Sequence, residues 1–303
     1  MTRAGRRLIR SLIGFLSVWM FLQGADSSIR AYVLGGDRIE LRAVSEKDLA
    51  SVVEVTFLGN CGFFITAGST SILFDAVHRQ TAYPQYSTPE DAFRKMLNRE
   101  APFERIDLML VSHDHPDHIT ADMAFQVLSN HPETVLVVND RALTGIRERV
   151  PEDYEKMKNR VLSITPKPGL METASVRGLT FKVFTQIHDP HTKEQVSAFL
   201  LDLNGIRILL HADSDLDQNA ADLAKLGLED EDIDLWFFTD RPHAALDKVM
   251  TTIVKPKAYV IMHNPVNDVR KYEATVKVYP YTIGFISPME KKLFLKERGG
   301  FSR

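Results

Sequence analysis

Short apolar runs, each bounded by turn-forming residues, recur along most of the 303-residue chain. Runs of about four to eight residues flanked by Gly, Pro, Asn or Asp are typical of buried or half-buried β-strands. Asn204-Gly205 is a strong signal for a two-residue hairpin, and Gly68-Ser69 is a second candidate turn. The pattern predicts strands at 52–57, 63–66, 71–74, 108–111, 135–138, 181–187, 196–203, 206–210, 233–238 and 258–262.

Longer segments with apolar residues on one face lie between these strands. They predict helices at 89–99, 121–129, 142–149, 152–158, 217–226 and 244–254. Thr120 is placed to cap the second helix, and Gly227 suits a left-handed end of the fifth. Meandering strands followed by alternating helices and strands occur twice. The pattern therefore predicts an α/β or α+β fold with two packed sheets and helices outside.

The chain has the length and composition of a globular protein. Its 44% hydrophobic and 25% charged residues are ordinary, and 303 residues suffice for one large or two small domains without disulfides. The single cysteine, Cys61, cannot form an intrachain disulfide. Because it lies in an apolar stretch, we expect Cys61 to be a small core residue rather than a nucleophile.

The N-terminal segment 1–25 differs from the rest of the chain. Four arginines precede an apolar run at 11–22, and small residues follow it, as in a secretory signal peptide. Gln23 stands where a small residue is expected before a cleavage site, so an uncleaved membrane anchor formed by residues 11–25 is the alternative. We therefore expect an exported protein, periplasmic or secreted, or one attached to the membrane by this segment.

The charge of the remaining chain argues against a nucleic-acid partner. Removal of segment 1–25 takes away four arginines and no acidic residue, which lowers the formal net charge from −3 to −7. A body this acidic is a poor partner for a polyanion. We expect a small molecule or a lipid as the substrate instead.

The stretch His113-Asp114-His115-Pro116-Asp117-His118 places five potential metal ligands within six residues. Imidazoles and carboxylates crowded this closely repel and desolvate one another with little benefit to a fold. A divalent metal reverses that balance, and neutral imidazole with ionised carboxylate is the ligand set of hydrolytic zinc sites. The stretch follows the apolar run 106–111, so we expect these side chains on a loop that leaves a buried strand.

This stretch resembles the HxHxDH signature of the metallo-β-lactamase superfamily, and the resemblance extends over residues 52–265. Asp75 follows an early strand, Asp213 follows the hairpin and His263 ends a late strand, in an order similar to that of the family. The resemblance implies an α/β fold, an αββα sandwich with a metal site at one edge of the two packed sheets. We accordingly divide the chain into a signal peptide or anchor at 1–25, a lead-in segment at 26–50, a metallo-hydrolase domain at 51–290 and a C-terminal tail at 291–303.

The resemblance also implies ligands for two metals. It assigns His113, His115 and a later histidine to the first metal, and Asp117, His118 and His263 to the second, with Asp213 bridging both. Zinc is the expected metal, with Mn²⁺ and Fe²⁺ as alternatives. The later histidine has two candidates. His188 directly follows its strand, as the ligand does in the family, so we favour it over His191, which we expect on the rim in contact with substrate or solvent.

Two further residues are expected close to the ligands. Asp75 is placed to orient the histidine loop by hydrogen bonds. His211 and Ala212 stand where a glycine commonly precedes the aspartate in the family. His211 lies two residues from Asp213 and on the same side of a regular strand, so it is an extra ligand, a hydrogen-bond donor to a ligand or a buried polar group.

The remaining candidates have weaker support. Asp240 and His243 follow a predicted strand and are candidates for substrate contact. His78 and His131 have no ligand pattern around them, so we expect both at the surface or on the rim of the site.

The expected chemistry is hydrolysis. Two metals about 3.5–4 Å apart share a water and lower its pKa, which produces a metal-bound hydroxide at neutral pH. The hydroxide would attack an ester, lactone, amide or phosphodiester, and Asp117 would orient it and pass a proton to the leaving group. The alternative is a catalytically idle protein that binds metal or senses a ligand on the same scaffold, which the intact ligand set disfavours.

Overall fold

A computed structural model describes residues 29–35, 38–189, 191–192, 194–239, 244–265 and 281–297 of the chain. The predicted signal peptide or anchor at 1–25 lies outside these ranges. Within them, no helix combines the length and the apolar character needed to cross a membrane.

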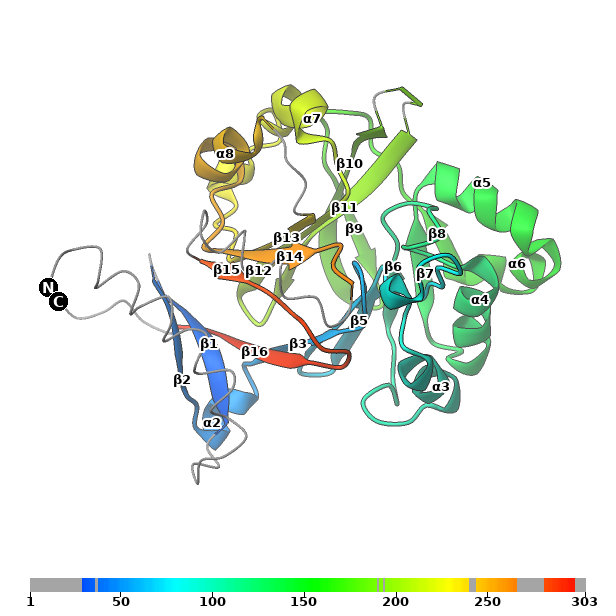
Figure 1. The fold of residues 1–303 in the computed structure, drawn as a ribbon, viewed down its shortest axis with the longest axis horizontal. Coiled ribbons are helices and arrows are strands. Elements are labelled where there is room, and N and C mark those ends of the chain that lie inside the picture. Colours follow the sequence, from blue (N-terminus) through cyan, green and yellow to red (C-terminus); the bar gives the residue numbers. More distant parts are fainter. Residues whose placement is uncertain are drawn as a thin grey trace, which may run out of the picture.

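Two sheets form the centre of the described structure (Figure 1). The first has the strand order β2-β1-β16-β3-β4-β5-β6-β7-β8, and the second has the order β15-β14-β13-β12-β11-β10-β9. The strands of the first sheet are β1 (Arg30–Gly35), β2 (Arg38–Ala43), β3 (Val53–Phe57), β4 (Phe63–Ala67), β5 (Thr70–Phe74), β6 (Leu108–Leu110), β7 (Val135–Val138), β8 (Val161–Ser163) and β16 (Lys291–Lys296). Those of the second are β9 (Glu172–Val176), β10 (Leu179–Asp189), β11 (Glu194–Leu203), β12 (Ile206–Ala212), β13 (Leu235–Thr239), β14 (Ala258–Met262) and β15 (Thr282–Ile283).

Helices cover the outer face of each sheet. The first sheet is covered by α3 (Glu90–Asn98), α4 (Ala121–Asn130), α5 (Asp140–Arg149) and α6 (Pro151–Met157). The second is covered by α7 (Leu216–Leu223), α8 (Leu246–Lys248) and the π-helix η4 (Val249–Val254). Short helical segments are α2 (Glu46–Leu49), η1 (Pro84–Tyr86), η2 (Lys158–Arg160) and η3 (Leu228–Asp230).

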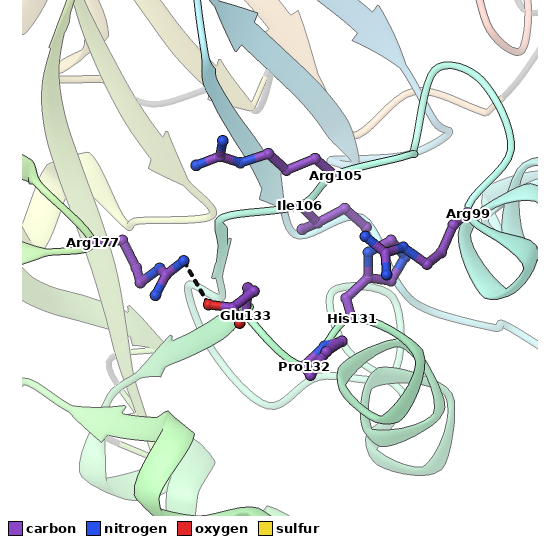
Figure 2. Close-up of a pocket in the computed structure, with 7 residues that line it drawn as sticks. All are labelled: Arg99, Arg105, Ile106, His131, Pro132, Glu133 and Arg177. Carbon is purple, nitrogen blue, oxygen red and sulfur yellow. Dashed lines mark ion pairs between the residues drawn. The ribbon is translucent and has the colours of Figure 1, made fainter.

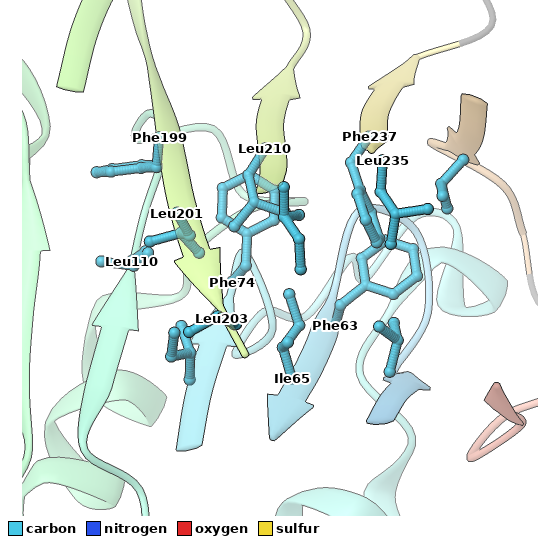
Figure 3. Close-up of a cluster of buried hydrophobic side chains, with 14 of the residues drawn as sticks. Phe63, Ile65, Phe74, Leu110, Phe199, Leu201, Leu203, Leu210, Leu235 and Phe237 are labelled. Atoms are coloured by element: carbon cyan, nitrogen blue, oxygen red, sulfur yellow. The ribbon is translucent and has the colours of Figure 1, made fainter. Parts of the chain in front are cut away.

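The main core lies between the two sheets. Figure 3 shows side chains of β4, β5 and β6 meeting those of β11, β12 and β13. Phe63 of the first sheet packs edge-on against Phe237 of the second, with 5.0 Å between ring centroids. Burial of such large aromatic side chains removes much apolar surface from water and is the main force that holds the layers together. The predicted αββα sandwich is confirmed.

Strand β16 is the largest departure from the sequence pattern. Residues 291–296 were expected in a C-terminal tail, yet they form a strand between β1 and β3, parallel to the first and antiparallel to the second. Phe294 reaches the inter-sheet core and stacks on Tyr32 at 5.5 Å. The lead-in segment likewise contains β1 and β2. These pairings join opposite ends of the chain, so no local pattern marks them.

Two predicted helices have different extents in the structure. The helix expected at 217–226 ends at Leu223, and a turn leads to Gly227 with a φ of 66°. The helix expected at 244–254 is divided into α8 and the π-helix η4. Here Thr251 and Thr252 donate their hydroxyls to the carbonyls of Asp247 and Lys248, at 2.8 and 2.7 Å. Such bonds compete with the regular helical pattern and favour its distortion.

The ends of several strands meet at one edge of the sandwich. Ser112 follows β6, and its carbonyl accepts hydrogen bonds from Ser197 N of β11 at 2.8 Å and from Asn139 Nδ2 at 3.0 Å. These bonds connect the two sheets at the start of the histidine loop. The side chains that follow β5, β6, β12 and β14 are therefore brought close to those at the end of β10.

Candidate metal centre

The histidine loop folds back on itself immediately after β6. The carbonyl of His115 accepts hydrogen bonds from the backbone N–H groups of His118 and Ile119, both at 3.0 Å. This turn brings His113 and His115 into one cluster and Asp117 and His118 into the next, while the rings of His113 and His118 stay 4.0 Å apart. The loop thereby contributes to two neighbouring ligand clusters.

The first cluster consists of His113, His115 and His188. One ring nitrogen from each lies within 4.8 Å of those of the others, and the ring centroids are 4.5–4.8 Å apart. His188 Nδ1 donates to the carbonyl of Asp213 at 2.6 Å, which leaves the lone pair on Nε2. His115 Nε2 lies 2.9 Å from Glu194 Oε2, which leaves its lone pair on Nδ1. His188 and His115 are therefore both held in the tautomer that a metal needs.

The second cluster consists of Asp117, His118 and His263, with Asp213 beside it. His263 Nε2 lies 3.1 Å from Asp117 Oδ2 and 3.4 Å from Asp213 Oδ2. His118 Nε2 lies 3.6 Å from the same oxygen of Asp213. Asp213 thus contacts the second cluster through its carboxylate and the first through its backbone carbonyl.

Asp75 orients the histidine loop through hydrogen bonds to Ser112 and His118. Its carboxylate accepts hydrogen bonds from Ser112 N at 2.8 Å, from Ser112 Oγ at 2.6 Å and from His118 Nδ1 at 2.8 Å. Because Ser112 Oγ donates to Asp75, it accepts from His113 Nδ1, which lies 2.9 Å away. One buried carboxylate therefore leaves Nε2 of both His113 and His118 as the lone-pair nitrogen.

Left-handed backbone conformations gather at these strand ends. Asn60, Asp75, Ala212 and His263 have φ angles of 51°, 42°, 51° and 60°. This region is unfavourable for residues with a Cβ atom, and such conformations cluster at functional sites. The loop containing Asn60 and the one containing His263 are joined by two backbone hydrogen bonds of 3.1 Å. Asn60 Nδ2 also donates to Asp117 Oδ2 at 3.2 Å, which fixes that carboxylate.

Opposite pKa shifts accompany this geometry. Burial and the nearby charge of His118 lower the pKa of His113 well below its usual value. Burial would also lower the pKa of His118, but the charges of Asp75 and Asp213 outweigh it and raise this pKa well above its usual value. Burial opposes ionisation of Asp117, yet its hydrogen bond to His263 and the charge of His118 hold the pKa of that carboxyl below its usual range. The carboxylates of the second cluster therefore stabilise positive charge beside them, whereas His113 in the first cluster favours the neutral form.

The residues present fit a pair of divalent metals. Among the described residues, Nε2 of His113 and Nε2 of His118 are buried and have no hydrogen-bond partner. A buried polar nitrogen without a partner is costly, and a metal in each cluster would satisfy both atoms. Imidazole with carboxylate is a donor set that zinc and iron accept.

The two candidates for the third histidine lie in different places. His188 is the last residue but one of β10 and lies in the first cluster, whereas His191 is exposed in the following turn. The backbone N–H of His191 donates to Asp189 Oδ1 at 2.7 Å, which closes that turn. The structure therefore brings His188, and not His191, to the other ligands.

Of the three alternatives for His211, the structure shows the buried polar group and not a ligand or a donor to a ligand. Its Nε2 is bonded to Gln186 Oε1, its Nδ1 accepts from Trp236 Nε1 at 2.9 Å, and its ring packs on Phe238. His211 therefore lies as a polar residue among the apolar side chains between the second sheet and the helices that cover it. The side-chain alternation of β12 breaks at Ala212, where φ is 51° and the register shifts, so residues 211 and 213 point in different directions.

His78 and His131 are buried rather than at the surface or rim. His78 Nε2 donates to the carbonyl of Tyr86 at 2.7 Å, and burial lowers the pKa of His78 to about 4. His131 Nε2 donates to the carbonyl of Met96 at 2.7 Å. Both histidines satisfy backbone carbonyls in the core. Asp240 and His243, the candidates for substrate contact, lie outside the described residues.

Several residues of the site were missed by the sequence reasoning. Glu194 is only 6% exposed, holds His115 and pairs with Arg141 at 2.9 Å. The sequence signal that could have identified Glu194 is a carboxylate at the start of an apolar strand. Asn60 follows Gly59, a turn signal that favours a left-handed residue. Cys61, expected to be a core residue, is buried but also lies 3.7 Å from Asp213 Oδ1.

A separate surface pocket lies at the opposite ends of the strands. Ile106 and His131 precede β6 and β7, whereas the ligands follow β6. The pocket is lined by Arg99, Arg105, Ile106, His131, Pro132, Glu133 and Arg177 (Figure 2). Its arginines are engaged, for example Arg177 with Glu133 at 2.8 Å. None of the ligands of the two clusters lines it.

Comparison with known families gives one match. A family profile described as the Beta-lactamase superfamily domain matches residues 54–233, more than half of the chain. No curated protein matches the chain at a significant level.

Solved structures share the fold at low sequence identity. Igni18, a metallo hydrolase from Ignicoccus hospitalis KIN4/I, is 15% identical with a TM-score of 0.54, over 82% of this chain and 100% of that one. A protein from Veillonella parvula DSM 2008, described as a possible metal-dependent hydrolase, is 14% identical with a TM-score of 0.53, over 79% and 98%. CmlA, a diiron β-hydroxylase from Streptomyces venezuelae, is 14% identical with a TM-score of 0.52, over 84% and 55%. These similarities show the fold alone.

Proposed function

Because the chain belongs to the metallo-β-lactamase superfamily, we propose that it is an exported, dinuclear zinc hydrolase that cleaves an ester, lactone, amide or phosphodiester. The observation that carries this proposal is the convergence of ligands from separate segments of the chain. His113, His115 and His188 form one cluster, and Asp117, His118 and His263 form the next, with Asp213 between them.

The protein side chains have distinct tasks in such a reaction. Metals bound in the two clusters would lower the pKa of water and polarise the scissile bond. Asp117 is held by Asn60 and His263, and its lowered pKa keeps it ionised at neutral pH. Its Oδ2 would orient the attacking water, and the low pKa makes this carboxylate a weak base that readily releases any proton it takes up to the leaving group.

The choice of zinc rests on the donor set. The first cluster contains three imidazoles and no carboxylate, which suits zinc and is less suited to Mn²⁺. Igni18 is described as a metallo hydrolase, which supports hydrolysis, whereas CmlA is described as a diiron enzyme. Iron is therefore the main alternative to zinc.

Aromatic side chains beside the second cluster are evidence for a substrate that contains an apolar group. The ring of Tyr86 lies 5.9 Å from that of His263, and Tyr83, which is 60% exposed, packs edge-on against Tyr86 at 6.4 Å. A half-buried ring next to a polar centre, with an exposed ring against it, is well suited to hold an acyl chain or a ring. This favours a small apolar ester or a lipid over a fully polar substrate.

Export is proposed from segment 1–25 alone. Its basic start and apolar run have the layout of a signal peptide or an uncleaved anchor. Cell fractionation of the full chain, with N-terminal sequencing of the product, separates these two outcomes. Recovery of the intact chain in the soluble cytoplasmic fraction would refute export.

Metal analysis combined with an activity panel tests the catalytic proposal. We expect about two zinc equivalents per chain and turnover of at least one probe among esters, lactones, phosphodiesters and β-lactams. Bound metal without turnover would instead support the metal-binding or ligand-sensing alternative.

A matched pair of histidine variants sharpens this experiment. His115→Ala removes a ligand of the first cluster and should abolish turnover and weaken metal retention while circular dichroism is unchanged. His191→Ala removes an exposed imidazole three residues after His188 and should leave metal retention and the circular dichroism spectrum unaffected. Unchanged metal content in His115→Ala would refute the assignment of the ligands.

A further inference from the structure

Cys61, the single cysteine of the chain, lies in the tight turn between β3 and β4. Gly62 N donates to the carbonyl of Gly59 at 2.7 Å, and Leu58 N donates to that of Gly62 at 2.8 Å. A Cβ atom at position 62 would lie 2.9 Å from the carbonyl oxygen of Gly59 and 3.1 Å from both Ala76 Cα and the Asp75 carbonyl oxygen. Only glycine permits this close approach, which presses the turn against the end of β5.

The turn places the thiol of Cys61 beside the second ligand cluster. Its Sγ lies 3.7 Å from Asp213 Oδ1. The sulfur, a carboxylate oxygen of Asp213 and a ring nitrogen of His118 all lie within 4.8 Å of one another. All three residues are buried, with exposed fractions of 0%, 1% and 1%.

A second observation points to a ligand at this position. Among the residues that the structure describes, buried Nε2 of His118 has no hydrogen-bond partner, since Nδ1 is the nitrogen bonded to Asp75 and Asp213 Oδ2 lies 3.6 Å from Nε2. Zinc binds sulfur at about 2.3 Å and nitrogen or oxygen at about 2.0–2.2 Å, so neighbouring ligand atoms around one zinc are about 3–4 Å apart. The observed separation of 3.7 Å between Cys61 Sγ and Asp213 Oδ1 lies within that range.

We propose that Cys61 is a ligand of the metal in the second cluster, bound as a thiolate together with His118 and Asp213. This inference rests on the metal centre of the proposed function. As the sulfur–metal bond forms, the thiol proton leaves to solvent, and no oxidant or reductant takes part. A thiolate shifts the preference of the site toward zinc and away from Mn²⁺ and Mg²⁺.

The competing explanation is that the thiol only donates a hydrogen bond to Asp213. Two substitutions separate the explanations. Cys61→Ser keeps an O–H donor for Asp213 but removes the sulfur, whereas Cys61→Ala removes both. If sulfur binds metal, the two variants should lose affinity for the second metal equivalent by a similar factor of at least about tenfold. If Cys61→Ser binds the second equivalent as tightly as wild type, the proposal is overturned.

Cobalt spectroscopy provides a direct readout that does not depend on activity. The full chain loaded with two equivalents of Co²⁺ should show a near-ultraviolet sulfur-to-cobalt charge-transfer band, and both variants should lack it. With one cysteine in the chain, loss of the band in the variants assigns it to Cys61. Circular dichroism of the metal-free proteins serves as the folding control.

X-ray absorption of the wild-type zinc protein keeps the proposal testable if the variants do not fold. We expect one sulfur scatterer at about 2.3 Å for every two zinc ions. Two bound metals and turnover with no sulfur scatterer would overturn the role of Cys61 and leave the hydrolase proposal intact. Failure of the wild-type chain to bind metal would overturn both.

Discussion

The two ligand clusters of the centre are held in different ways. In the first, each imidazole is hydrogen-bonded on its far nitrogen to a group outside the cluster, namely Ser112, Glu194 or the carbonyl of Asp213. In the second, Asp75 and Asn60 also support two of the ligands from outside. Here, however, the ligands contact one another as well, as His263 does with the carboxylates of Asp117 and Asp213.

The difference follows from charge. Three neutral imidazoles have no attraction for one another, so only bonds from outside can aim them at a common point. Carboxylates and imidazoles attract, and the charges of Asp75 and Asp213 raise the pKa of His118. The same carboxylate charge would stabilise a cation bound in the second cluster. We therefore expect the first cluster to depend on its supporting residues and the second on its own carboxylates.

The largest expected effect comes from Asp213→Asn. This change removes the negative charge that contacts His118 and His263 but keeps the backbone carbonyl that holds His188. Metal content should fall from about two equivalents to about one, and hydrolysis should fall on the order of 10³-fold. Metal analysis and kcat/KM measure both, with the surface variant Asp222→Asn as a control. Retention of two equivalents would contradict the separation of the clusters.

The free energy of unfolding should depend on pH through His78, whose imidazole is buried. His78 has a pKa of about 4 in the folded chain against 6.5 as its ordinary value, so between these values the unfolded chain binds more protons. Stability should therefore fall as the pH drops from 6.5 to about 4, with a contribution from His78 of about 3 kcal/mol. Urea unfolding of the metal-free chain should show a smaller loss in His78→Gln. An equal loss in both proteins would contradict this origin.

The metal affinity of the first cluster should depend on the residues outside it that hydrogen-bond its imidazoles. Glu194→Ala removes the carboxylate that accepts from His115, so the imidazole loses its fixed tautomer and orientation. We expect metal affinity of the first cluster to fall by about 10- to 100-fold. Competition with a chelator measures the affinity, and Glu194→Gln, whose amide oxygen still accepts, should recover part of it. Unchanged affinity would show that the cluster needs no outside support.

The smallest expected effect concerns the aromatic side chains beside the second cluster. Tyr86→Ala removes the ring that lies 5.9 Å from that of His263 but keeps the backbone carbonyl that accepts from His78. KM for a long-chain ester should rise by about 2- to 10-fold, with kcat and metal content unchanged. A short acetyl ester is the matched control. An equal change for both esters would argue against a role of Tyr86 in binding an apolar group.

Local chemistry was enough to predict most elements and the start of the site. Apolar runs predicted the strands that carry the ligands, because burial of alternate side chains depends on neighbours a few residues away. The spacing from His113 to His118 predicted a metal loop for the same reason, since five donors in six residues are unfavourable without a cation. Asn204-Gly205 predicted a hairpin that the structure contains, with φ angles of 53° and 81°.

The tertiary structure decided what depends on distant contacts. The conformation of Ala212 turned His211 away from the centre although Asp213 is only two residues later. The packing of the Gly62 turn on β5 placed Cys61 beside Asp213, and the pairing of β16 with β1 and β3 converted an expected tail into a central strand. Local patterns encode which face of an element is buried. Which residues from separate elements meet is set by packing and backbone strain summed over the whole sandwich.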